Sequence, residues 1–184
     1  MAIDPGGDPS RVVDFLKQES LTLTHILNTH FHLDHIYGNA ALAKTTSAPI
    51  LANPEDEFLL GTEIGGGGFM GLPKVPDFDY SFIKPGSHTF VGALCQAIST
   101  PGHTPGSLSF YFPEAGILFA GDVLFRRGVG RTDFPGGNWE TLLESIRDGL
   151  FSLPPETVVY SGHGDPTTIG EETANNPYFT DFSF

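Results

Sequence analysis

The sequence feature that most constrains the fold is a group of histidines directly after an apolar segment. Residues 21–28 alternate apolar and polar side chains, as a half-buried strand does. Three histidines and one aspartate then fall within six residues: His30, His32, Asp34 and His35. Neutral imidazole and carboxylate are the usual protein ligands of zinc and of non-haem iron. The pattern therefore predicts a metal site at the end of a strand, completed by ligands from elsewhere in the chain.

Three later segments offer ligands of the same kind, namely His103, Asp122 and His163. Each borders an apolar, strand-like run and is bracketed by glycine, proline or small residues. Loops at the ends of strands are where a rigid scaffold usually carries its binding and catalytic side chains. We therefore expect these three residues to join the first group in one site.

In this order, the segments resemble the metallo-β-lactamase superfamily, in particular its glyoxalase II-like hydrolases. The matching motifs are His30-x-His32-x-Asp34-His35, Pro101-Gly102-His103-Thr104, Gly121-Asp122 and Ser161-Gly162-His163. They span most of the chain, and four motifs in order are far more specific than any one alone. The resemblance implies an α/β fold, the four-layer αβ/βα sandwich of the superfamily, formed as a single domain over residues 1–184.

The resemblance also implies a set of metal ligands. One divalent ion would be bound by His30, His32 and His103, a second by Asp34, His35 and His163, with Asp122 bridging both. Two bound metals lower the pKa of a shared water from about 15.7 towards ~7, so a metal-bound hydroxide can attack a carbonyl or phosphoryl centre. Asp34 and Asp122 would thereby belong to the catalytic machinery. Zinc is the expected metal, with iron or manganese as alternatives.

The function that the resemblance implies is dinuclear hydrolysis of a thioester such as an S-2-hydroxyacyl-glutathione. Zinc β-lactamases that use a cysteine ligand differ at Asp122, and Cys95 matches no ligand position, so antibiotic hydrolysis is not expected as the main activity. Arg126 and Arg131 follow Asp122 closely in a glycine-rich segment, and they are candidates for substrate contact.

Two alternatives stay open. A mononuclear iron persulfide dioxygenase is similar along Gly130-Arg131-Thr132-Asp133-Phe134 and would use His30, His103 and Asp122. Two histidines and one carboxylate leave positions open for oxygen. The other alternative is a metal-binding protein without catalytic activity. The number and identity of the bound metals would separate these functions.

Net charge, hydropathy and cysteine content limit the binding partners and the cellular location that we expect. The formal net charge is −13, with 9 Lys and Arg against 22 Asp and Glu. Nucleic-acid binding draws on clustered Lys and Arg, so we expect a small-molecule substrate and no nucleic acid. No apolar run approaches the ~20 residues of a membrane span, so no membrane is expected. The single cysteine and the absence of a signal-peptide pattern favour the cytoplasm.

Periodicity and capping residues predict the secondary structure. The expected elements are helices over 9–19 (capped by Asp8), 34–43, 54–60 and 139–151 (capped by Asn138); strands over 21–28, 49–52, 89–99, 107–112, 117–120 and 157–160; and loops over 61–80 and 126–137. The aromatic residues of the 61–80 loop are expected to pack in the protein rather than to bind substrate.

The chain opens almost directly on the turn Asp4-Pro5-Gly6. Members of the superfamily place further strands before this turn. We therefore expect that the N-terminal strands are missing or that another element covers the sheet edge. An open edge invites pairing with a second chain, which predicts a homodimer or lowered stability.

Overall fold

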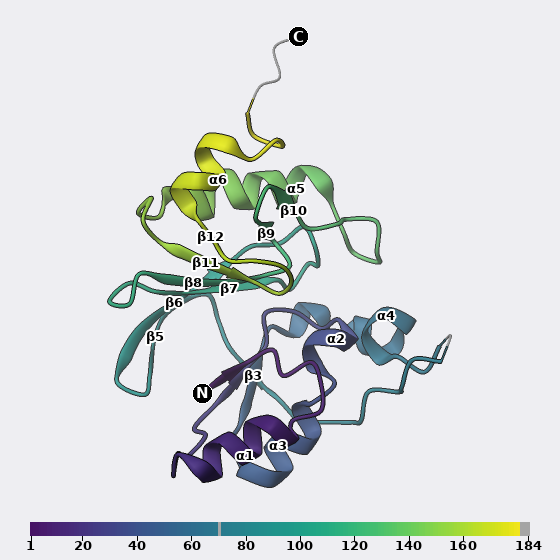
Figure 1. The fold of residues 1–184 in the computed structure, drawn as a ribbon. Coiled ribbons are helices and arrows are strands. Elements are labelled where there is room, and N and C mark those ends of the chain that lie inside the picture. Colours follow the sequence, from purple (N-terminus) through teal and green to yellow (C-terminus); the bar gives the residue numbers. More distant parts are fainter. Residues whose placement is uncertain (70, 181–184) are drawn as a thin grey trace. The chain divides into compact units, whose positions relative to one another are not determined.

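The computed structural model describes residues 1–69 and 71–180, and the chain divides into two compact units, Met1–Lys84 and Pro85–Phe184 (Figure 1). Among the described helices, none has the length and hydropathy that crossing a membrane requires.

The first unit contains a four-stranded parallel sheet in the order β1-β2-β3-β4. Its strands are β1 (Ala2–Ile3), β2 (Ile26–Leu27), β3 (Ile50–Ala52) and β4 (Ser81–Phe82). Parallel neighbours need crossover connections, which helices supply here. These are α1 (Ser10–Gln18), α2 (Leu33–Ile36), α3 (Asn39–Thr46), the 3₁₀ helix η1 (Pro54–Gly61) and α4 (Glu63–Gly66). Because all four strands run the same way, the residues that follow them gather at one edge of this sheet.

Helix α1 begins one residue later than predicted, although the Asp8 carboxylate does accept the Ser10 N–H at 3.0 Å. The strand predicted over 21–28 shrinks to Ile26–Leu27, because its neighbour β1 offers only two residues for pairing. β1 stands at one end of the strand order, and a homodimer across that edge stays a prediction.

The single helix predicted over 34–43 is wrong, because the chain breaks at Gly38 into α2 and α3. The Gly38 N–H donates to the Pro5 carbonyl at 2.7 Å. A Cβ on Gly38 would lie only 2.4 Å from that carbonyl oxygen. The break therefore lets the helix connection lie directly against the Asp-Pro-Gly turn, a long-range contact that local propensity does not contain.

The predicted loop 61–80 contains helix α4, which Thr62 caps by accepting the Gly65 N–H at 3.4 Å. Phe78 and Tyr80 pack edge-on against Phe31, with ring centroids 5.8 and 5.1 Å away. The prediction that loop aromatics pack is confirmed for these two. Phe69, the third aromatic residue that the prediction concerns, is about half exposed, as is Leu72; Met70 lies outside the described residues.

The second unit contains a six-stranded sheet in the order β12-β11-β8-β7-β6-β5. Its strands are β5 (Gly86–Phe90), β6 (Ala93–Ser99), β7 (Leu108–Phe112), β8 (Ile117–Gly121), β11 (Val158–Ser161) and β12 (Thr167–Thr168). All neighbours are antiparallel except β8 and β11, which run parallel with Ser161 opposite Gly121. A separate hairpin pairs β9 (Leu124–Phe125) with β10 (Gly128–Val129), so the predicted loop 126–137 contains one short strand, β10.

Two strand predictions for this unit are wrong. The strand expected over 89–99 is a β5–β6 hairpin that turns at Val91 and Gly92, whose φ angles are 54° and 82°. Two positive φ angles match the mirror-image turns of two-residue hairpins. Valine is rare in that conformation, so Val91-Gly92 was not predicted to be a turn. No strand was predicted after 157–160, yet β12 (Thr167–Thr168) follows it.

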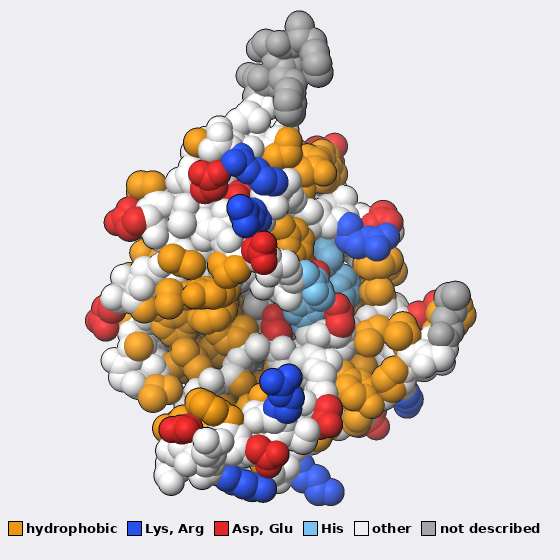
Figure 2. All heavy atoms as spheres, viewed as in Figure 1, with side chains coloured by type: hydrophobic (Ala, Val, Ile, Leu, Met, Phe, Trp, Pro, Cys, Tyr) orange, Lys and Arg blue, Asp and Glu red, His pale blue; other side chains and the backbone are white. Residues whose placement is uncertain are grey.

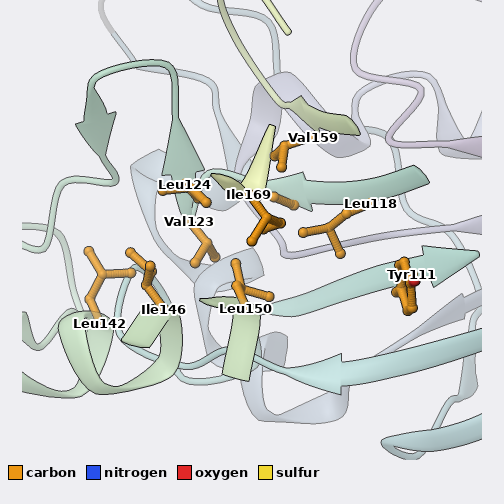
Figure 3. Close-up of a cluster of buried hydrophobic side chains, with 10 residues drawn as sticks. Tyr111, Leu118, Val123, Leu124, Leu142, Ile146, Leu150, Val159 and Ile169 are labelled. Atoms are coloured by element: carbon orange, nitrogen blue, oxygen red, sulfur yellow. The ribbon is translucent and has the colours of Figure 1, made fainter. Parts of the chain in front are cut away.

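The helices of this unit cover one face of the sheet. They are α5 (Trp139–Glu144), the π-helical η2 (Ser145–Gly149), the 3₁₀ helix η3 (Leu150–Ser152) and α6 (Ile169–Asn175). Asn138 caps α5 as predicted, accepting the Thr141 N–H at 2.9 Å. Figure 3 shows Leu142, Ile146 and Leu150 directed at side chains of the sheet such as Leu118 and Val159, which together form the buried core.

A buried carboxylate, Glu172, ties α6 to two other elements. Its Oε1 accepts the Thr167 hydroxyl at 2.6 Å, and its Oε2 accepts the Asn176 amide at 2.7 Å and the Arg127 N–H at 2.9 Å. Glu172 is fully buried. These three donors join α6, β12 and the β9–β10 turn.

Replacing Glu172 with alanine should lower the free energy of unfolding by about 3 kcal/mol, because three donors lose a charged acceptor. Urea unfolding followed by the fluorescence of Trp139, the single tryptophan, measures this. Glu171→Ala is the control: its carboxylate pairs with Arg127 on the surface, and its loss should cost less than about 1 kcal/mol. Equal urea midpoints for the two variants would contradict the structural role of Glu172.

Candidate metal centre

Four of the predicted ligands belong to the first unit and follow β2. His30 and His32 lie in the extended segment before α2, and Asp34 and His35 lie in the first turn of that helix. The three histidines are buried, whereas the Asp34 side chain is half exposed. The structure therefore places these four residues next to one another in the first unit, and their binding of metal stays a prediction.

The imidazole rings are in direct contact. His30 Nε2 lies 3.1 Å from His32 Nδ1, and the His30 and His35 ring centroids are 4.1 Å apart. Asp34 Oδ2 lies 3.9 Å from His35 Nε2. Buried polar atoms require partners, and two ring nitrogens at this separation must share either a proton or a cation.

Sequence reasoning missed Asp4, which organises this group. Its Oδ1 accepts the Thr29 N–H at 2.7 Å, and its Oδ2 accepts the Thr29 hydroxyl at 2.6 Å and the His35 Nδ1–H at 2.9 Å. A carboxylate on one ring nitrogen fixes the tautomer and leaves the other nitrogen available to a metal. The signal was present in the sequence: Asp4 ends a strand before Pro-Gly, but the residues predicted only a turn.

Asp4 also determines the tautomer of His30, through a second hydrogen bond made by Thr29. The Thr29 hydroxyl gives its proton to Asp4, so its oxygen must accept the proton of His30 Nδ1, which lies 2.9 Å away. The His30 proton is thereby held on Nδ1, and Nε2 is left as the basic nitrogen. This is the form in which an imidazole binds a metal ion.

The other three predicted ligands belong to the second unit and converge on one oxygen atom. His103 Nε2 lies 3.8 Å and His163 Nε2 lies 3.6 Å from Asp122 Oδ2. His103 is buried and Asp122 nearly so, while the His163 side chain is 56% exposed. A carboxylate oxygen that faces two imidazole nitrogens is suited to bridge two cations.

Two glycines allow the backbone to hold His103 in place. The His103 Nδ1–H donates to the Arg131 carbonyl at 2.7 Å, which directs Nε2 towards Asp122. A Cβ on Gly130 would lie 2.0 Å from the Asp122 carbonyl oxygen, and one on Gly102 (φ 130°) would lie 2.3 Å from the Leu142 nitrogen. Side chains at either position would push the ligand loops apart.

The two arginines predicted to contact substrate each pair with an acid. The Arg131 guanidinium forms two 2.7 Å hydrogen bonds with Asp133 and lies 3.9 Å above the Phe134 ring. The hydrogen bonds from Arg131 lower the pKa of Asp133 to about 2 and raise the pKa of Arg131. Arg126 pairs with Asp165 at 3.4 Å, both being exposed. Contact of either arginine with a substrate stays a prediction.

Replacing Arg131 with alanine should return the pKa of Asp133 from about 2 towards its ordinary value of about 3.9, because the hydrogen bonds that favour the carboxylate are lost. In the native protein the pair stabilises the fold above about pH 4, and that contribution is lost as the pH falls towards 2. A carboxyl NMR titration measures the shift, and Arg126→Ala should leave Asp133 unchanged. An unaltered Asp133 pKa in Arg131→Ala would contradict the assigned cause.

Cys95 is a buried member of β6, as expected for a residue that packs rather than binds metal. Burial raises the pKa of its thiol to about 12, so the thiolate that metals require is disfavoured.

Comparison with known proteins places the chain in a family. The family model of the Metallo-beta-lactamase superfamily matches residues 3–163, a range that includes all seven predicted ligands. Hydroxyacylglutathione hydrolase GloC of Haemophilus influenzae is 38% identical over 180 residues, covering 96% of this chain and 85% of the relative. Probable metallo-hydrolase YqgX of Bacillus subtilis is 36% identical over 192 residues, covering 100% of this chain and 88% of the relative.

Solved structures agree with the sequence relatives. BLEG-1 B3 metallo-beta-lactamase is 38% identical with a TM-score of 0.88, covering 97% of this chain and 88% of that one. TTHA1623 in a di-iron-bound form is 36% identical with a TM-score of 0.87, covering 96% and 87%. ETHE1 from Myxococcus xanthus is 33% identical with a TM-score of 0.76, covering 95% and 71%. The chain belongs to the metallo-β-lactamase superfamily and has its mixed α/β fold, as its histidine and aspartate motifs predicted.

Proposed function

We propose that this protein is a dinuclear metal-dependent hydrolase that cleaves a thioester, such as an S-2-hydroxyacyl-glutathione. Membership of a superfamily of metallo-hydrolases supports the metal-dependent hydrolysis. The observation that carries the dinuclear proposal is the position of Asp122, whose Oδ2 faces the Nε2 atoms of His103 and His163 at 3.8 and 3.6 Å.

The proposed ligands are His30, His32 and His103 for one metal, Asp34, His35 and His163 for the other, and Asp122 for both. The chemistry of this donor set fits the group, because imidazole nitrogen and carboxylate oxygen suit zinc, iron and manganese, and no thiolate is required. Metals bound there would polarise the scissile carbonyl and make a nucleophile of water near neutral pH. Zinc is proposed as the metal, with iron and manganese as alternatives; a di-iron-bound relative supports keeping iron.

The residues around the ligands set the protonation states for this chemistry. Asp4 and Thr29 hold protons on Nδ1 of His35 and His30, and the Arg131 carbonyl does the same for His103. The basic Nε2 atoms are thus left for the metals. Asp34, with its half-exposed carboxylate, is proposed to accept the proton that the attacking water loses and to pass it to solvent.

The thioester preference is supported by the relative named as a hydroxyacylglutathione hydrolase, 38% identical across 96% of this chain. Hydrolysis by activated water needs no protein nucleophile, which agrees with the raised pKa of Cys95. Arg131 and Arg126 are proposed to contact the substrate by exchanging their present acidic partners for its carboxylates. If Arg131 only binds substrate, Arg131→Ala should raise KM more than it lowers kcat.

A second candidate is a mononuclear iron persulfide dioxygenase that uses His30, His103 and Asp122. Its support is the likeness to ETHE1 from Myxococcus xanthus, 33% identical with a TM-score of 0.76. This chain differs at Asp122 from the zinc β-lactamases that use a cysteine ligand, but not every β-lactamase need use one. Because a protein described as a B3 metallo-β-lactamase is 38% identical, a β-lactam belongs among the test substrates.

The deciding experiment is metal analysis followed by three assays. Protein purified without added metal or chelator should contain close to two metal ions per chain and hydrolyse S-lactoylglutathione. Chelation should abolish this hydrolysis, and added zinc should restore it. One iron per chain with oxygen uptake on glutathione persulfide would establish the second candidate instead. Hydrolysis of nitrocefin alone would replace the thioester with a β-lactam, and protein that binds no metal would end the proposal.

For partners, we propose a small-molecule substrate, no nucleic acid, no membrane, a homodimer and a cytoplasmic location. On the face drawn in Figure 2, Lys and Arg side chains of the described residues are interspersed with acidic, apolar and uncharged ones and form no continuous basic surface. This distribution and the net charge of −13 support a function without nucleic acid.

A further inference from the structure

A buried carboxylate, that of Asp56, contacts the segment that carries the predicted metal ligands His30 and His32. Asp4 precedes this segment in the sequence, whereas Asp56 follows it. Asp56 lies in the first turn of η1 and is 1% exposed. Its Oδ2 accepts the Phe31 N–H at 3.1 Å. Phe31 is the residue between His30 and His32, so this hydrogen bond acts on the peptide that joins the two predicted ligands.

The Phe31 side chain and carbonyl are held by the same part of the chain. Its ring is buried in a cluster with Leu59 of η1 and packs edge-on against Phe78 and Tyr80. The Phe31 carbonyl lies so close to α4 that a Cβ on Gly65 would be 2.7 Å from its oxygen. Segment 54–66 therefore contacts the N–H, the ring and the carbonyl of this one residue.

The contacts that hold Phe31 also affect His30 and His32, because side chains alternate in direction along an extended segment. Successive side chains of extended backbone point to opposite sides, so anchoring Phe31 on one side directs His30 and His32 to the other. The 3.1 Å contact between His30 Nε2 and His32 Nδ1 agrees with this common direction. Rotation of the peptide between them would separate the two nitrogens.

We propose that Asp56 is a positioning residue that fixes His30 and His32 in the geometry required to bind metal. This inference rests on the proposed metal-dependent function. Asp4 acts on the proton of His30 through Thr29, whereas Asp56 acts on the backbone between the two histidines. The two carboxylates thus control different properties of the same ligands.

The test is cobalt(II) binding by the demetallated full-length protein, followed by its visible absorption and by competition with a chelator. Asp56→Leu removes the acceptor and should weaken cobalt binding by about tenfold to a hundredfold, the usual loss for residues that orient metal ligands. It should also change the cobalt spectrum and speed amide hydrogen exchange at Phe31. Asp56→Asn keeps an oxygen acceptor and should recover most of the affinity.

Two controls separate positioning from charge and from stability. Glu55→Gln removes an exposed acid from the same helical turn and should bind cobalt as the unmodified protein does. Leu23→Ala destabilises a different buried cluster of the same unit and should keep the cobalt spectrum. A folded Asp56→Leu variant with unchanged affinity and spectrum, or a Leu23→Ala variant with the same spectral change, would overturn the inference. Absence of cobalt binding in the unmodified protein would instead overturn the proposed function.

Discussion

Replacing Asp122 with alanine should lower kcat/KM by on the order of 10³-fold, because both metal positions share its carboxylate in the proposed site. Loss of the metals removes several kcal/mol of transition-state stabilisation, and ~4 kcal/mol corresponds to that factor. The structural reason is the convergence of His103 Nε2 and His163 Nε2 on Asp122 Oδ2. The assay is steady-state hydrolysis of the best substrate together with metal content per chain.

Asp165→Ala is the matched control for this variant. Asp165 is an exposed aspartate of the same unit that pairs with Arg126. Its removal should leave the metal content unchanged and alter kcat/KM only through Arg126. An Asp122→Ala variant that retains two metals and full activity would refute the dinuclear proposal.

Replacing Asp4 with alanine should weaken metal binding by about tenfold to a hundredfold, since the tautomers of His30 and His35 lose their common support. It should also lower the free energy of unfolding by about 3 kcal/mol, because the Thr29 N–H, the Thr29 hydroxyl and His35 Nδ1–H all lose an acceptor. Because His30 is a proposed ligand of one metal and His35 of the other, zinc binding at both positions should weaken. Isothermal titration of the demetallated protein with zinc measures the affinity.

Asp8→Ala provides the comparison for Asp4. Asp8 is an exposed aspartate of the same unit whose carboxylate accepts the Ser10 N–H at the start of α1. Loss of this one exposed acceptor should cost about 1 kcal/mol or less and touches no predicted ligand. Equal zinc affinities for the two variants would show that Asp4 stabilises the fold without organising the histidines.

The predicted ligands stand out in the sequence because metal ligands must be particular residue types, and here they follow strand-like segments. The residues that orient them could not be read in the same way. Asp4 and Asp56 each contact a residue that is twenty-five positions away, Thr29 and Phe31 respectively. The local patterns around them, an Asp-Pro-Gly turn and an acidic helical turn, do not predict these contacts. Their roles depend on β1 pairing with β2 and on η1 packing against Phe31.

The secondary-structure predictions were wrong where a long-range contact or an unusual backbone conformation interrupted the local pattern. The helix after His35 breaks at Gly38 because the chain there lies against the Pro5 carbonyl. The β5–β6 hairpin turns at Val91, a residue that usually avoids positive φ, so the pattern read as one long strand. The Asn138 cap, in contrast, is a purely local interaction, and it was predicted correctly.

The parallel pairing of β8 with β11 also bears on how such a protein can change during evolution. Ser161 lies opposite Gly121, and the Gly162 N–H donates to the Gly121 carbonyl at 2.9 Å. The distance between Asp122 and His163 is therefore set by a strand ladder rather than by the residues that connect them. Insertions or deletions in the surface loops between Asp122 and His163 can alter the substrate that binds near these two side chains without moving either side chain. Substrate range can thus diverge among relatives while the pair itself stays fixed.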